Sequence, residues 1–113
     1  MKGLIIKEKW LNLILEGKKT WEIRNFNTSK IGERITLIMS GTKKVYGECI
    51  IKDSIKINKD ILLKNLEKHQ IKREDVLDLK YNNPHAWVLS DIKRYSSPKP
   101  YAHKKGCVIW VNV

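Results

Sequence analysis

The chain has 113 residues, and 23 lysines and arginines against 12 aspartates and glutamates give a formal net charge of +11. This length predicts a single domain spanning residues 1–113, and the 42% of hydrophobic residues are enough for a core, which excludes a disordered chain. No apolar run approaches the roughly 20 residues of a membrane span, and no signal peptide is recognisable. We therefore expect a soluble, cytoplasmic protein that does not enter a membrane.

The first elements are a strand, a helix and a second strand. Gly3–Ile6 is predicted to be a short strand. Apolar residues then recur at helical spacing over Lys7–Glu16, and Gly17 follows where a left-handed C-terminal cap is expected. The next strand is predicted over Thr20–Arg24, with polar and apolar residues alternating between its faces.

A polar loop over Asn25–Gly32 leads into a β-rich region. Glu33–Met39 alternates cleanly and predicts a strand, and Ser40–Lys44 has the composition of a turn. Val45–Ile57 is a long β-rich stretch, and Gly47 inside it indicates a bulge or bend. A strand of this length could contribute to two sides of a barrel.

Two helical segments are expected next. Asn58 or Asp60 can cap a helix that extends towards Ile71, and a shorter helix is expected within Arg73–Tyr81. The Asn82–Pro84 segment stops it.

The last third of the chain predicts two strands separated by a loop. Ala86–Tyr95 alternates as a strand, Ser96–Pro100 is expected to be a stiff loop, and Cys107–Val113 is the closing strand. The helices do not alternate regularly with the strands, which argues against a parallel sheet. The pattern favours an α+β fold, a small and mostly antiparallel β-barrel of five to six strands with two or three helices at its ends.

The cysteines and histidines do not indicate a metal site. Cys49 and Cys107 each lie in an apolar, strand-like run, where free cysteine behaves as a small buried hydrophobic residue. The chain has no C-x-x-C pair, and its histidines are scattered at positions 69, 85 and 103. We predict no metal, no cofactor and no disulfide.

The segment from Gly17 to Asn25 carries the most chemical information. Glu22 and Arg24 share one face of the predicted strand with Thr20, and Lys19 directly precedes it. If this face lines the mouth of a barrel, these charges need partners, because an unpaired buried charge is costly. If it faces solvent, they form an ordinary surface ion pair, and the residues alone leave both interpretations open.

The pattern Gly17-x-Lys19-x-x-Glu22-x-Arg24 resembles the G-x-K-x-x-E-x-R signature of the ASCH domain family, which belongs to the PUA-like superfamily. The first strand and helix, and the ending Tyr101–Val111, also resemble members of that family, so the resemblance covers essentially the whole chain. It implies a PUA-like β-barrel with a cleft lined by the motif residues. It also implies a role linked to RNA, in translation, RNA processing or transcription regulation.

Some members of this family are enzymes. One bacterial group of similar size hydrolyses N4-acetylcytidine with a lysine, a threonine and a glutamate. The lysine corresponds to Lys19, but the threonine nucleophile corresponds to Glu22, and a carboxylate cannot replace a hydroxyl in acyl transfer. Thr20 lies about 6–7 Å away along the strand, and the glutamate could correspond to Glu67 or Glu74. Other members are ribonucleases, and no motif in this chain secures that role.

Outside the motif, several residues are candidates for the rim of the cleft. Trp21 either packs in the core or stacks on a base, whereas the other tryptophans, at positions 10, 87 and 110, are predicted to be core residues. Two polar segments form candidate rims, and each could instead be an ordinary polar loop. The residues concerned are Ser40, Thr42, Lys43 and Lys44 in the first segment, and Tyr101, His103 and Lys104 in the second.

The leading hypothesis is a protein that binds RNA or a nucleotide in a basic cleft centred on Lys19, Glu22 and Arg24. The net charge favours a polyanionic partner, although residues 1–58, with 12 basic and 6 acidic side chains, and residues 59–113, with 11 and 6, share it evenly. The alternatives are an amidohydrolase of acylated nucleosides, in which Lys19, Thr20 and Glu22 are the catalytic candidates, a ribonuclease, and a module that binds a protein partner.

Overall fold

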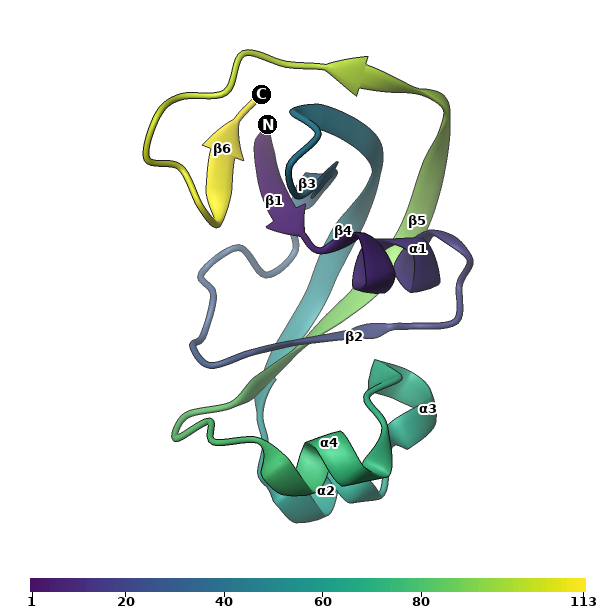
Figure 1. The fold of residues 1–113 in the computed structure, drawn as a ribbon, viewed down its shortest axis with the longest axis vertical. Coiled ribbons are helices and arrows are strands. Elements are labelled where there is room, and N and C mark those ends of the chain that lie inside the picture. The colour runs from purple at the N-terminus through teal and green to yellow at the C-terminus, as the bar shows by residue number, and fades with distance from the viewer.

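The computed structural model describes residues 1–113 as one curled sheet with short helices gathered mainly at one end (Figure 1). The strands are β1 (Lys2–Ile6), β2 (Trp21–Arg24), β3 (Arg34–Met39), β4 (Lys44–Lys56), β5 (His85–Pro100) and β6 (Trp110–Asn112). The helices are α1 (Glu8–Leu15), α2 (Lys59–Leu63), α3 (Leu66–His69) and α4 (Arg73–Asp78). None of these helices could cross a membrane.

The six strands lie in the order β2-β5-β4-β3-β1-β6. Only β1 and β3 run parallel, and the other four neighbouring pairs are antiparallel. The sheet curls into a half-barrel, and its edge strands are β2 and β6. The predicted α+β class, with a small and mostly antiparallel barrel-like sheet, is confirmed, and there are four short helices where two or three were predicted.

The long strands β4 and β5 form most of the wall and bend where glycine allows it. Their register shifts between Val45 and Gly47, as the glycine within the predicted strand indicated. A Cβ atom on Gly47 would lie 2.5 Å from the backbone oxygen of Lys93, so a side chain at this position would push the two strands apart. The predicted bulge is therefore confirmed.

The expected loop Ser96–Pro100 is wrong, because these residues extend β5 to Pro100. Lys99 and Pro100 pair with Val45 and Lys44 of β4. Beyond Leu89, whose N–H donates to the oxygen of Thr20, β5 pairs with no strand on its other side. Prolines are tolerated in a strand whose N–H groups need no acceptor there.

The closing strand is shorter than predicted. Only Trp110–Asn112 is a strand, and it pairs with Leu4, Gly3 and Lys2 of β1. The N–H of Ile5 still donates to the oxygen of Ile109 at 2.9 Å, but Val108 and Ile109 bend away from regular strand geometry.

The helix expected between Asn58 and Ile71 is divided in two. Asn58 caps α2 by accepting a hydrogen bond from the N–H of Ile61 at 2.9 Å. Asn65 leaves helical geometry between α2 and α3, and its side chain donates to the carbonyl of Ile61 at 2.7 Å. The region therefore forms three short helices, α2 to α4, where two were predicted.

The strand β2 separates two hydrophobic cores. The larger core fills the half-barrel beneath α1 and includes Trp87, whereas the smaller one lies between β2 and the helices α2 to α4. Trp21 and Ile23 belong to the smaller core. Alternation along the strand therefore turns Glu22 and Arg24 away from these helices.

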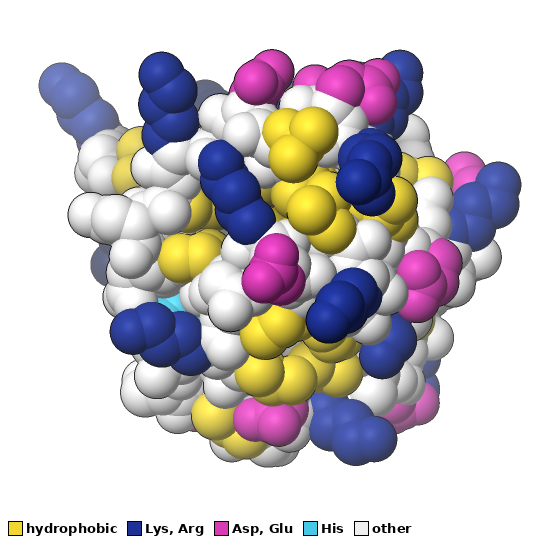
Figure 2. Space-filling view, turned by 90° about the horizontal axis from the view of Figure 1, so that it is seen from below, with side chains coloured by type: hydrophobic (Ala, Val, Ile, Leu, Met, Phe, Trp, Pro, Cys, Tyr) yellow, Lys and Arg dark blue, Asp and Glu magenta, His cyan; other side chains and the backbone are white.

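Figure 2 shows the end of the molecule that carries α2 to α4, where basic and acidic side chains are interspersed around apolar atoms. Residues 59–80 carry six basic and five acidic side chains. This face therefore has no patch of a single charge sign.

Candidate functional site

A cavity of about 420 Å³ lies beside β2. Its walls come from the end of β1, the start of α1, β2, and the segment that follows α3. The charged and aromatic residues that line it are Lys7, Trp10, Lys19, Glu22, Arg24, Asp75 and Tyr81. All three residues of the predicted cleft centre, Lys19, Glu22 and Arg24, lie on this wall.

The Lys19 side chain is buried and points to this cavity wall. The residue is only 2% exposed, and its Nζ donates to the backbone oxygen of His69 at 2.7 Å. The same nitrogen lies 3.6 Å from Oε1 of Glu22 and 4.8 Å from the centre of the Trp10 ring. Burial lowers the Lys19 pKa from 10.5 to about 8, against the opposing effect of the Glu22 carboxylate. A substantial fraction of this amine is thus neutral slightly above neutral pH.

Arg24 holds Glu22 in a fixed orientation. Its Nε and Nη2 lie 3.1 and 2.9 Å from the same carboxylate oxygen, Oε2. Nη2 also donates to the backbone oxygen of Ile5 at 3.0 Å, which ties β2 to the end of β1. Glu22 is 5% exposed, and its other oxygen, Oε1, faces the Lys19 amine at 3.6 Å. The site therefore offers one carboxylate oxygen, held in place, that can accept a hydrogen bond from a ligand.

His69 supports the site from behind. Its Nδ1 accepts from the N–H of Ile71 at 3.0 Å, so the imidazole must donate from Nε2 to the backbone oxygen of Leu62, 2.7 Å away. Burial lowers the pKa of this histidine below 6.5. The neutral ring thus joins α2, α3 and the following turn, and it fixes the carbonyl that receives Lys19.

Two other candidates from the motif segment, Thr20 and Trp21, do not line the cavity. The Thr20 side chain is exposed and lines no cavity, while its backbone pairs with Lys68 and Leu89. Trp21 is buried in the smaller core, and the Lys68 amine lies over its ring at 5.1 Å, so the ring faces are covered by the protein.

The predicted rim residues fall largely around a second cavity, of about 320 Å³. Lys43, Tyr101 and His103 line it, and Ser40 lines both cavities. Thr42, Lys44 and Lys104 line neither cavity. Glu67 and Glu74 are exposed and also lie outside both.

Sequence reasoning did not identify several residues that the fold brings to the first cavity. Trp10 was expected in the core; it does pack against the core and also lines the cavity. Asp75 lies in α4 and Tyr81 follows this helix, and both come more than fifty residues after β2 in the chain. No local pattern marks them, because only the docking of the helices α2 to α4 under β2 places them there.

The chain is similar to known ASCH domain proteins over most of its length. The model of the ASCH domain family matches residues 4–108. A serine-to-alanine variant of ZmASCH from Zymomonas mobilis has a TM-score of 0.79 at 15% identity, covering 99% of this chain and 87% of that one. The unsubstituted ASCH structure from the same organism has a TM-score of 0.73 at 17% identity, covering 88% and 72%.

At such low identity these crystal structures show only that the fold is shared. No curated protein sequence gives a significant match. The family match nevertheless spans almost the whole chain and includes the segment from Gly17 to Arg24 on the cavity wall. The chain belongs to the ASCH domain family.

Proposed function

We propose that this protein binds RNA or a nucleotide and that the cavity beside β2 receives a single base with its sugar. The observation that supports this most directly is the convergence of Lys19, Glu22 and Arg24 on one wall of that cavity. ASCH domains are PUA-like, and the family is linked to RNA, which agrees with such a ligand.

The size and lining of the cavity suit a nucleoside. Its volume of about 420 Å³ falls in the range of about 300–1,000 Å³ that small-molecule sites occupy. Tyr81, which is exposed, supplies aromatic surface on which a base can stack. Trp10, whose ring lies beside Lys9 and Lys19, adds apolar wall. Oε1 of Glu22, which faces Lys19, has a second lone pair that can accept a hydrogen bond from an exocyclic amine, such as that of cytosine or adenine.

The charge of the cavity suits a ligand that combines a base with a phosphate. Lys7, Lys19 and Arg24 are cationic, and Glu22 and Asp75 are anionic. Arg24 and Lys19 are both paired with Glu22. Lys7 has no carboxylate partner, and Lys19 faces the same cavity, so both can attract an anionic group. A site that held only phosphates would not need the fixed carboxylate.

Calorimetric titration with the four ribonucleoside 5′-monophosphates tests this proposal. We expect at least one to bind to the wild type, and Lys19→Met to weaken its affinity by at least about tenfold, as the loss of a charge-assisted contact does. Lys18→Met removes the same charge from an exposed side chain and should leave binding unchanged. Absence of binding to all four, or equal affinity in Lys19→Met, would refute the site.

The lowered Lys19 pKa favours a second candidate function, the hydrolysis of an acylated nucleoside. A lysine with a pKa of about 8 can act as a general base near neutral pH. Neutral Lys19 would take a proton from water as the water oxygen attacks the acetyl carbonyl of N4-acetylcytidine. It would then return the proton to the departing N4, which yields cytidine and acetate.

Acetate release from N4-acetylcytidine tests the second candidate. Hydrolysis through neutral Lys19 predicts a rate that rises with pH towards a plateau above about 8. The Lys19→Met variant should lose this activity, and Lys18→Met should keep it. No turnover, or turnover unaffected by Lys19→Met, would rule this function out.

A further inference from the structure

A second cavity adjoins the first one. Its volume is about 320 Å³, and it shares three lining residues, Ile5, Ser40 and Val108, with the cavity beside β2. Val108 is 75% exposed although it is apolar. The two spaces thus meet at a common wall, and an apolar side chain at their junction is left open to contact a ligand.

The second cavity differs from the first in charge. None of its ten lining residues is an aspartate or a glutamate, whereas the first cavity has both Glu22 and Asp75. Its cationic donor is Lys43, and the hydrogen-bonded pair of Tyr101 and His103 keeps one further donor for an anion. Lys43 lies on its rim, and the Tyr101 hydroxyl and His103 Nδ1 lie 2.9 Å apart.

The side chains around this second cavity extend the positive charge. The 22 residues that follow Asp91 include five lysines and arginines and no acidic residue. The β4–β5 register places Lys44 opposite Pro100 and Val45 opposite Lys99, so this basic segment runs beside Lys44. In contrast to the mixed face in Figure 2, residues 92–113 carry only basic charged side chains, with Glu48 of β4 opposite Lys93 as the neighbouring acidic residue.

We infer that the second cavity holds the phosphodiester and the following nucleotide of a single-stranded RNA whose first base occupies the cavity beside β2. The ligand class is then an oligonucleotide of at least two nucleotides, rather than a free nucleoside. This inference rests on the proposed function. The carboxylate-containing cavity recognises a base edge, and the carboxylate-free cavity binds the phosphate that follows it.

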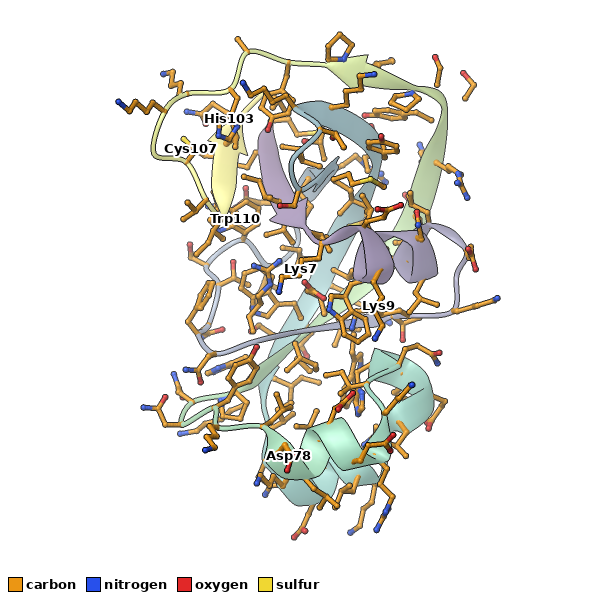
Figure 3. The ribbon with its side chains drawn as sticks, in the orientation of Figure 1. Lys7, Lys9, Asp78, His103, Cys107 and Trp110 are labelled. Atoms are coloured by element: carbon orange, nitrogen blue, oxygen red, sulfur yellow. The ribbon has the colours of Figure 1, made fainter.

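The thiol of Cys107 can report on occupancy of the second cavity. Cys107 is partly exposed and lines it. Figure 3 shows Cys107 and His103 on the segment between β5 and β6, away from Lys7 and Lys9 at the start of α1. The other cysteine, Cys49, is fully buried, and burial raises its pKa to about 12. Iodoacetamide should therefore alkylate Cys107 alone in the folded protein.

The test compares each ribonucleoside 5′-monophosphate with the matching 5′-phosphorylated homodinucleotide. We expect the dinucleotide to bind about tenfold more tightly, because one additional nucleotide contributes a stacking contact and a phosphate contact. We also expect the dinucleotide to slow alkylation of Cys107, and the mononucleotide or inorganic phosphate at equal saturation to leave it unchanged.

The double substitution Lys43→Ala with His103→Ala separates the two cavities. It should reduce dinucleotide affinity to about that of the mononucleotide and leave mononucleotide affinity within about twofold. The matched control, Lys64→Ala with Lys68→Ala, removes exposed lysines from the opposite end and should change neither.

The experiment distinguishes failure of this inference from failure of the proposed function. Mononucleotide binding with equal dinucleotide affinity and no protection of Cys107 would overturn the second cavity's role and leave the proposed function standing. Absence of binding by both ligands would overturn the proposed function and this inference together.

Discussion

Arg24 contacts one oxygen of the Glu22 carboxylate with two nitrogens and leaves the other oxygen facing Lys19. Three charged groups of one motif are thus arranged so that a single acceptor remains for a ligand. The arrangement is held at both ends by backbone carbonyls, those of Ile5 and His69. Stability and the proposed binding therefore involve the same side chains, and substitutions can measure each effect separately.

Glu22→Gln should destabilise the fold. The change leaves Lys19 and Arg24 buried or half-buried without a counter-charge, and breaking such a buried pair costs about 3 kcal/mol. The free energy of unfolding measured in urea gives this value directly. Glu16→Gln, at an exposed carboxylate paired only with Lys18, should change it by less than about 0.5 kcal/mol. Equal effects of the two substitutions would contradict the buried pairing of Glu22.

Nucleotide affinity should fall as the pH rises through about 8, the pKa of Lys19. The protonated amine is the form that attracts a phosphate, so affinity should decrease by up to about tenfold per pH unit above that value. Titrations between about pH 7 and 9 measure this decrease, and Lys19→Met should show none. Hydrolysis of an acylated nucleoside would show the opposite trend, because its rate depends on the neutral amine.

The stability contribution of Lys19 has the opposite sign to its effect on binding. The unfolded chain keeps this proton up to pH 10.5 and the folded chain only up to about 8. The unfolded state therefore binds more protons in this interval, and the Lys19 contribution to the free energy of unfolding increases as the pH rises from about 8 to 10.5. Subtracting the pH profile of Lys19→Met from that of the wild type isolates this contribution, and a flat difference would contradict the burial of the charge.

His69 should make the helical end of the molecule sensitive to acid. Its pKa lies below 6.5 in the folded protein, because burial disfavours the imidazolium. The unfolded chain takes up a proton first, so stability present above pH 6.5 is lost as the pH falls towards the folded pKa. Thermal unfolding of wild type and His69→Gln between about pH 7.5 and 5 measures this loss. His69→Gln should be less stable at neutral pH and should lose less on acidification; a parallel decline of both proteins would exclude the role of His69.

Binding of single-stranded RNA should depend on salt through the basic segment that follows Asp91. Removing one lysine that contacts a phosphate lowers the slope of log affinity against log salt by about one. We expect Lys99→Ala and Lys104→Ala each to lower it, and Lys64→Ala on the helical end to leave it unchanged. A tetranucleotide titrated between about 50 and 200 mM salt provides the slopes. Equal slopes for all three variants would place the RNA on another face.

The part of the candidate site that depends on local strand geometry could be predicted from the sequence. Strict alternation along β2 places Glu22 and Arg24 on one face and Trp21 on the other, and the structure confirms that division. The same pattern gave no indication that Lys19 is buried, because its acceptor is the carbonyl of His69, 50 residues later.

The remaining differences have tertiary causes. Asp75 and Tyr81 reach the cavity only through the docking of helices whose own sequences carry no mark of it. The prolines after Tyr95 predicted a loop, but β5 has no second partner there, so they remain within a strand. The even division of charge between the two halves concealed the acid-free segment after Asp91, because the acidic residues of the second half all precede residue 92.

The position of Arg24 also bears on how the chain avoids self-association. β2 is a four-residue edge strand that pairs only with β5, and on its other side Arg24 reaches the carbonyl of Ile5 through its side chain. An unpaired strand edge is a template for intermolecular sheet formation, and charged side chains turned inward are one means of blocking it. Replacing both Glu22 and Arg24 with apolar residues would leave this edge unprotected, so these two charged residues also protect the chain against aggregation.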